Sequence, residues 1–173
     1  DLTNRIFLEH ISKTNRTIII STGMGKLNEI NNALDILSKN SNKIILLHCV
    51  SSYPTQEKEA SLANILELKS KFKDIIIWQS DHTNDIKVPL YAVAVGARVI
   101  EKHYMINKDD DCIDATVSIS ENQMLDLVTE IKKLEKIIGS PIYGVTESQK
   151  NSLIFRRSSW QKLSYLVAKK YVL

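Results

Sequence analysis

The chain has 173 residues, of which 43% are hydrophobic and 25% charged, and its formal net charge at pH 7 is +3. This composition is typical of one soluble globular domain and excludes a disordered chain. The longest apolar runs, such as Ile44–Leu47, are far shorter than the roughly 18 residues that cross a bilayer, so no membrane partner is expected. The first four residues, Asp-Leu-Thr-Asn, lack the basic and apolar regions of a signal peptide.

Charge and cysteine content indicate a cytoplasmic protein that does not bind nucleic acid. The lysines are spread along predicted helices opposite their apolar faces, which is typical of a solvated surface. The two cysteines, Cys49 and Cys112, do not suggest a disulfide framework, and this favours a reducing compartment.

The first half of the chain predicts two strand–helix units after an opening helix within Asp1–Asn15. Thr17–Ile20 is a β-branched run of the kind found in buried strands, and Ser21–Gly25 predicts a turn. Apolar side chains at spacings of three and four then predict a helix, with Leu27, Ile30, Leu34 and Leu37 on one face. Ile44–Val50 predicts the second strand, and the next helix carries on its inner face Leu62, Ile65 and Leu66.

The second half predicts two more units. Asp74–Gln79 is the third strand, and a short apolar helix opens near Pro89 and closes at Gly96. Arg98–His103 is the fourth strand, and a loop over Met105–Val117 follows it. The last clear helix has a capping box and an apolar stripe, formed by Ser120, Gln123, Met124, Leu127, Val128, Ile131, Leu134 and Ile138.

Four alternations of strand and helix, with continuous apolar runs, predict a parallel sheet covered by helices. Four such units make half of a (β/α)8 barrel of the TIM type, since a complete barrel takes roughly 250 residues. An open four-stranded parallel sheet fits the pattern as well, because periodicity cannot separate the two. The periodicity fades near residue 140, so residues 1–140 form the predicted domain and residues 141–173 an extension or the start of a linker.

Serines follow three of the predicted strands at equivalent positions, Ser21, Ser51 and Ser80. Ser21 precedes Thr22 and Gly23 at a helix N-terminus, where unpaired N–H groups and the helix dipole favour a phosphate. Any single serine there is more often a cap or turn residue. Three at matching positions make a phosphate cradle an equally good interpretation.

Two histidines, His82 and His103, also lie near strand ends. Ligands of α/β proteins gather at the carboxyl ends of parallel strands, so these side chains can converge on one point. Neutral imidazole nitrogens suit Mn, Fe, Co or Zn, although a pair from separate strands has no fixed spacing and leaves metal binding open. His48, inside an apolar run, is predicted to be buried and hydrogen-bonded, and His10 to lie on a helix surface.

Two further candidates are polar residues in loops. Asp114 stands alone among apolar neighbours, where a carboxylate needs a partner, although an Asx turn would also explain it. Tyr53, before Pro54, can offer its phenol to a substrate or simply wedge the loop. The adjacent carboxylates of Asp109–Asp111 are predicted to point different ways and remain solvated.

Five ordered motifs resemble the sialic acid synthases, which include N-acetylneuraminate, legionaminic acid and pseudaminic acid synthases. They are Ser-Thr-Gly-Met at 21–24, Leu-His-Cys-Val-Ser-Ser-Tyr-Pro-Thr at 47–55, Ser-Asp-His-Thr at 80–83, Ala-Val-Ala-Val-Gly-Ala at 92–97 and Val-Ile-Glu-Lys-His-Tyr at 99–104. The likeness runs from Asp1 to about Arg157. It implies a (β/α)8 barrel of which this chain holds about strands 5–8.

The resemblance also implies an activity, a transferase that forms a carbon–carbon bond. Such enzymes condense phosphoenolpyruvate with an N-acetylated amino sugar, such as N-acetylmannosamine or its phosphate, and release inorganic phosphate. The complete enzyme is expected to be a homodimer that uses a divalent metal, most often Mn²⁺, with Mg²⁺ or Co²⁺ as alternatives. The metal would bind to His82 and His103, and polarise the sugar aldehyde as a Lewis acid.

By the same resemblance, Ser21, Ser51 and Ser80 hold phosphoenolpyruvate. Tyr53 contacts the sugar, and Asp114 binds it close to the reacting carbon. The residue-level reading and the resemblance therefore select the same positions.

Three departures from the family are visible. Gly-Pro-Asp is replaced by Cys112-Ile113-Asp114, which alters the sugar loop. By the resemblance, the chain starts just after the position of the family's fourth barrel strand, so the glutamate and lysines of strands 1–4 are expected to lie outside it. Ser159–Leu173 does not resemble the family, so the antifreeze-like domain of the family is expected to be absent from this chain.

These departures leave two hypotheses. In the first, the chain is the carboxyl-terminal half of a synthase barrel and is inactive alone. In the second, it is a truncated, non-catalytic half-barrel whose exposed strand edges pair with another chain as an interaction or assembly partner.

Overall fold

The computed structural model describes residues 1–40, 43–106, 112–157, 159–162 and 168–171. The chain forms two compact units, residues 1–139 and residues 140–173. Within the described residues, no helix is long and apolar enough to cross a membrane.

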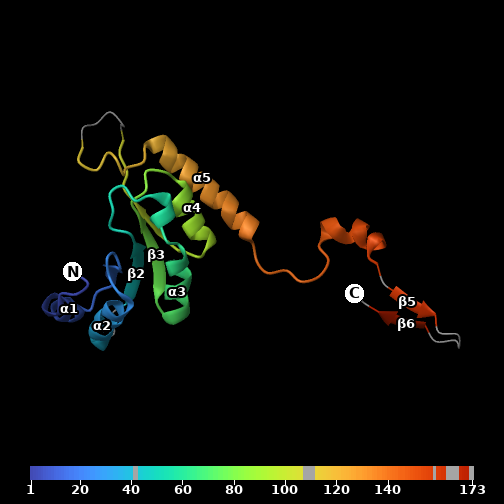
Figure 1. The fold of residues 1–173 in the computed structure, drawn as a ribbon, viewed down its shortest axis with the longest axis horizontal. Coiled ribbons are helices and arrows are strands. Elements are labelled where there is room, and N and C mark those ends of the chain that lie inside the picture. Colours follow the sequence, from blue (N-terminus) through green and yellow to red (C-terminus); the bar gives the residue numbers. More distant parts are fainter. Residues whose placement is uncertain (41–42, 107–111, 158, 163–167, 172–173) are drawn as a thin grey trace. The chain divides into compact units, whose positions relative to one another are not determined.

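A four-stranded parallel sheet forms the centre of the first unit (Figure 1). Its strands lie in the order β1 (Ile18–Ser21), β2 (Ile44–Cys49), β3 (Ile76–Asp81) and β4 (Ile100–Lys102). The alternation of strands and helices, and the parallel pairing, confirm the predicted α/β class.

Helices connect the strands and flank the sheet. In the first unit they are α1 (Arg5–Ser12), α2 (Leu27–Leu37), η1 (Ser38–Asn40), η2 (Glu57–Glu59), α3 (Ala63–Lys71), α4 (Lys87–Ala94) and α5 (Glu121–Ile138). The second unit has the 3-10 helix η3 (Glu147–Phe155) and an antiparallel pair of strands, β5 (Ser159–Lys162) and β6 (Ala168–Tyr171). The opening helix is shorter than the predicted Asp1–Asn15, and α4 begins two residues before Pro89.

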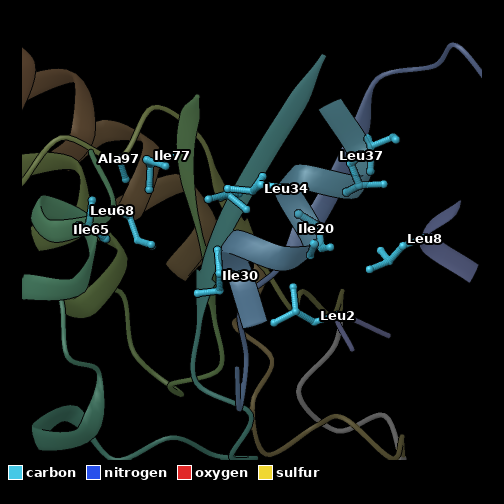
Figure 2. Close-up of a cluster of buried hydrophobic side chains, with 14 residues drawn as sticks. Leu2, Leu8, Ile20, Ile30, Leu34, Leu37, Ile65, Leu68, Ile77 and Ala97 are labelled. Carbon is cyan, nitrogen blue, oxygen red and sulfur yellow. The ribbon is translucent and has the colours of Figure 1, made fainter. Parts of the chain in front are cut away.

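The hydrophobic core lies on one face of the sheet. Alternate strand residues, among them Ile20, Leu46 and Ile77, pack there against apolar side chains of the helices (Figure 2). We call the other side the open face, because Ile19 and Ile76 on it are 51% and 50% exposed. No described strand pairs with the outer edge of β1 or of β4.

Three sequence-based details differ from the structure. Leu66 is 53% exposed, because the buried stripe of α3 follows Ile65 and Leu68, and one residue is about 100° around a helix. Strand β3 extends to Asp81, since its last residues pair with β4. In the apolar stripe of α5 only Leu127 is fully buried, and other residues of that stripe line a cavity of about 620 Å³ together with residues of α4 and β4.

Candidate active site

The register of the sheet brings three polar side chains together on the open face. Ser80 is paired with Cys49 on one side and with Glu101 on the other. Because side chains alternate between faces along a strand, the residues two positions beyond Ser80 and Glu101 emerge on the same side. These residues are His82 and His103, the two predicted metal ligands.

The imidazole of His82 is buried and held in one orientation. Its Nδ1 lies 2.8 Å from the carbonyl oxygen of Val50, and only 5% of the residue is exposed. A carbonyl oxygen can only accept, so Nδ1 carries the proton and the other ring nitrogen keeps its lone pair. That nitrogen, Nε2, lies 3.5 Å from the Ser80 hydroxyl.

His103 has the corresponding arrangement with a carboxylate. Its Nδ1 lies 3.5 Å from Oδ2 of Asp114, and the centroids of the His103 and His82 rings are 5.4 Å apart. The side chain of Asp114 therefore has His103 as an electrostatic partner. Its backbone carbonyl oxygen accepts a hydrogen bond from the hydroxyl of Ser118, which stabilises the loop. Imidazole ligands of metals typically donate their second ring N–H to a carbonyl or carboxylate, as Nδ1 of His82 does to Val50.

Tyr53 packs against both histidines. Its ring centroid is 4.1 Å from that of His82 and 5.9 Å from that of His103. The backbone N–H of Thr55 donates to the carbonyl oxygen of His82 at 2.9 Å, which ties the Tyr53 loop to the end of β3. Two predicted ligands and the predicted sugar-binding residues, Tyr53 and Asp114, thus form one cluster.

Partial burial raises the pKa of the Tyr53 phenol, and the nearby groups of Cys49, Asp114 and Glu101 raise it further. A raised phenol pKa extends the neutral, hydrogen-bond-donating form to a higher pH than for an ordinary tyrosine. We expect the difference in phenolate absorbance between the wild-type chain and Tyr53→Phe to titrate above the ordinary value of about 10. A midpoint at or below that of N-acetyltyrosinamide, titrated in parallel, would contradict this environment.

The donor set fits a metal with an open coordination sphere. Two imidazoles, of which His82 has its second nitrogen fixed by Val50, suit Mn²⁺, Co²⁺ or Fe²⁺, and catalytic sites leave further positions to water and substrate. Among the described residues no group of three or more His, Cys, Asp or Glu side chains is placed to hold a metal ion. Asp109–Asp111 lie outside the described residues.

Two of the three predicted phosphate-binding serines meet at Gly23. The backbone N–H of Gly23 donates to the Ser21 hydroxyl at 3.2 Å. A Cβ atom built on Gly23 would lie 2.3 Å from Oγ of Ser51 and 3.5 Å from Oγ of Ser21. The third, Ser80, donates instead to Oε1 of Glu101 at 2.7 Å.

Two residues of the cluster were not selected from the sequence. Glu101 accepts from Ser80, and the Cys49 thiol lies 3.8 Å from Nδ1 of His82. The signal for Glu101 was available, because it precedes His103 by two positions and so must share its face of a strand. His48 is buried, and its Nε2 lies 2.8 Å from the carbonyl oxygen of Ala60, which confirms the structural role predicted for it.

Comparison with known proteins finds one family. Residues 1–143 match the NeuB family. The chain is 41% identical over 174 aligned positions to the N,N'-diacetyllegionaminic acid synthase of Campylobacter jejuni, covering 98% of this chain and 50% of that protein. It is 32% identical to the N-acetylneuraminate-9-phosphate synthase of Mus musculus, covering 82% of this chain and 39% of the mouse protein.

Solved structures agree with the sequence relatives. The N-acetylneuraminic acid (sialic acid) synthetase of Leptospira borgpetersenii, solved in complex with citrate, superimposes with a TM-score of 0.83 at 38% identity. The match covers 90% of this chain and 54% of that chain. A truncated 3-deoxy-D-arabino-heptulosonate 7-phosphate synthase of Thermotoga maritima, 18% identical, shares the fold with a TM-score of 0.68. The barrel-type α/β fold is thereby confirmed, and the chain spans about half the length of the curated relatives it matches.

Proposed function

Because the chain belongs to the NeuB family, we propose that it carries the histidine-bearing half of a nonulosonic acid synthase active site. The family resemblance indicated by the motifs is confirmed. The proposed reaction condenses phosphoenolpyruvate with an N-acetylated amino sugar, such as N-acetylmannosamine or its phosphate, and releases inorganic phosphate. The observation that carries the proposal is the convergence of His82 and His103 beside Tyr53, with Nδ1 of His82 hydrogen-bonded to Val50 and Nδ1 of His103 3.5 Å from the carboxylate of Asp114.

In this proposal the Nε2 atoms of His82 and His103 would hold a divalent metal. When bound, Mn²⁺, or Mg²⁺ or Co²⁺ in its place, polarises the aldehyde of the sugar as a Lewis acid. The hydrogen bond to Val50 supports the assignment for His82, since it fixes the tautomer that leaves Nε2 free to coordinate, and the carboxylate of Asp114 lies 3.5 Å from Nδ1 of His103.

The chain's own side chains then orient the two substrates. Ser21 and Ser51 would donate hydroxyl hydrogens to phosphoenolpyruvate, whose negative charge makes such bonds stronger than neutral ones. Ser80 would do the same once its hydroxyl turns away from Glu101, to which it donates in this structure. Tyr53, whose phenol is neutral at pH 7, would donate to a sugar oxygen. Asp114 would accept from a sugar hydroxyl while holding the His103 ring.

Gly23→Ala is expected to weaken phosphoenolpyruvate binding while leaving the fold intact. The new Cβ would collide with the Ser51 hydroxyl, and that side chain can rotate away from its position. Loss of one hydrogen bond to a charged group corresponds to about tenfold to hundredfold in affinity. Calorimetric titration of Gly23→Ala, Ser51→Ala and the double variant measures this, and the two effects should not add. Independent, fully additive effects would show that Gly23 does not act through Ser51.

A binding experiment with the 173-residue chain tests the proposed site. Mn²⁺ bound at the histidines should broaden the vinyl proton resonances of phosphoenolpyruvate, because paramagnetic relaxation falls steeply with distance. The broadening should disappear in Ser80→Ala/Ser51→Ala, which keeps both histidines. Unbroadened resonances at saturating Mn²⁺ would refute a phosphoenolpyruvate site beside the metal.

The second candidate function is an assembly partner without catalysis. It is favoured by the outer edges of β1 and β4, which pair with no described strand, and by the exposed apolar residues Ile19 and Ile76 on the open face. Unpaired edges are templates for strand addition. Tight association of the chain with another protein, with no binding of metal or phosphoenolpyruvate, would favour this candidate over the synthase.

A further inference from the structure

A buried ion pair lies directly behind the two histidines. Nζ of Lys102 is 2.6 Å from Oδ2 of Asp81, and each side chain is only 2% exposed. The two residues are register partners across β3 and β4. Since His82 and His103 are their immediate neighbours in sequence, the pair joins the two strands at the point where the histidines leave the sheet.

The pair belongs to a larger network around the same backbone. The hydroxyl of Thr83 donates to Oδ2 of Asp81 at 2.7 Å, and the ammonium group of Lys102 also donates to the carbonyl oxygen of Thr83. From the other side, the backbone N–H of Thr55 donates to the carbonyl oxygen of His82. The backbone on both sides of His82 is therefore fixed.

We propose that the Asp81–Lys102–Thr83 network is a positioning device that sets the separation and ring orientation of His82 and His103. The proposal rests on the metal site proposed above. Buried charges require close partners, and a cross-strand pair at this depth tolerates only a narrow range of strand separations. Successive side chains of a strand point to opposite faces of the sheet, so His82 and His103 leave the face opposite to Asp81 and Lys102. A fixed separation of the two strands at the ion pair therefore also fixes the distance between the two imidazoles.

The test uses a variant that removes the network without leaving an unpaired charge. Replacing both members of a buried pair by apolar residues of similar size is often neutral for stability, so Asp81→Leu/Lys102→Met is expected to fold. A second, milder pair of variants is Thr83→Val, which removes the hydroxyl, and Thr83→Ser, which restores it. Glu9→Ala, which breaks the exposed Arg5–Glu9 pair, is the matched control.

Two measurements on the full chain report on the histidines. In the metal-free protein, long-range ¹H–¹⁵N spectra of the imidazoles identify the tautomer and hydrogen bond of His82. With Co²⁺ as probe, titration gives the affinity, and the visible ligand-field spectrum gives the coordination geometry. We expect altered His82 signals, a changed Co²⁺ spectrum and affinity lower by about tenfold to hundredfold, as for other outer partners of metal ligands.

The outcomes separate the two proposals. Thr83→Val should change the same signals in the same direction and by less, and Thr83→Ser should restore them. Wild-type imidazole signals in folded Asp81→Leu/Lys102→Met would overturn the positioning role and leave the pair a purely structural contact. Absence of Co²⁺ binding by the wild-type chain would refute the proposed metal site, while the imidazole spectra would still decide whether the network positions the rings.

Discussion

Replacing His82 or His103 by alanine is expected to lower the affinity for Mn²⁺ by at least about a hundredfold, because each removes half of the protein donors of the proposed site. Mutation of a residue that hydrogen-bonds to a metal ligand already lowers metal affinity by about tenfold to hundredfold, so loss of a ligand itself should lower it further. The concentration of free Mn²⁺, followed by its paramagnetic resonance signal, measures the affinity directly. The folded state of each variant is checked by far-ultraviolet circular dichroism.

His10→Ala is the matched control for this experiment. His10 is also a histidine near the end of a regular element, but it lies exposed on α1, and its loss should leave the affinity unchanged. Equal Mn²⁺ affinity in wild type, His82→Ala and His103→Ala would show that the metal, if it binds, binds elsewhere.

The second large effect is expected for a single substitution in the buried ion pair. Asp81→Ala leaves the ammonium group of Lys102 in a site where its side chain is only 2% exposed. Removing one partner of such a pair typically costs about 3–5 kcal/mol of folding free energy, because the remaining charge is buried without compensation. This cost is a large fraction of the stability of a small domain, which is about 5–15 kcal/mol.

Urea denaturation followed by circular dichroism measures this loss of stability. Glu9→Ala serves as the control, and its midpoint should stay within experimental error of the wild type, because exposed pairs contribute little. Restoration of most of the stability in Asp81→Leu/Lys102→Met would identify the unpaired charge as the cause. A midpoint for Asp81→Ala equal to that of Glu9→Ala would contradict the burial of the pair.

Much of the fold could be predicted from local sequence pattern. The four parallel strands follow from short β-branched runs, and their order follows from chain order, because each unit adds one strand beside the last. Patterning could not decide between an open sheet and a barrel, since the neighbours of the outer strands are not encoded within a single unit. The resemblance, supported by the solved relatives, decided that question.

The site was predictable where it depends on strand ends, and less so where it depends on side-chain packing. His82 and His103 converge because parallel strands in register carry them to one face. The stacking of Tyr53 depends on the path of a loop, which has no periodicity to reveal it. Asp81 and Lys102 were passed over because their burial is a property of the packed structure, and charged residues are mostly exposed.

We propose that this chain supplies the histidine half of a working synthase. A chimera tests it most directly, in which residues 1–143 replace the matching part of the Campylobacter jejuni relative, and phosphate release from phosphoenolpyruvate is measured with an N-acetylated amino sugar and Mn²⁺. We predict sugar-dependent phosphate release by the chimera, its loss in His82→Ala, and none from the 173-residue chain alone. A folded chimera that binds Mn²⁺ but releases no phosphate with any N-acetylated amino sugar, or release by the isolated chain, would contradict the account.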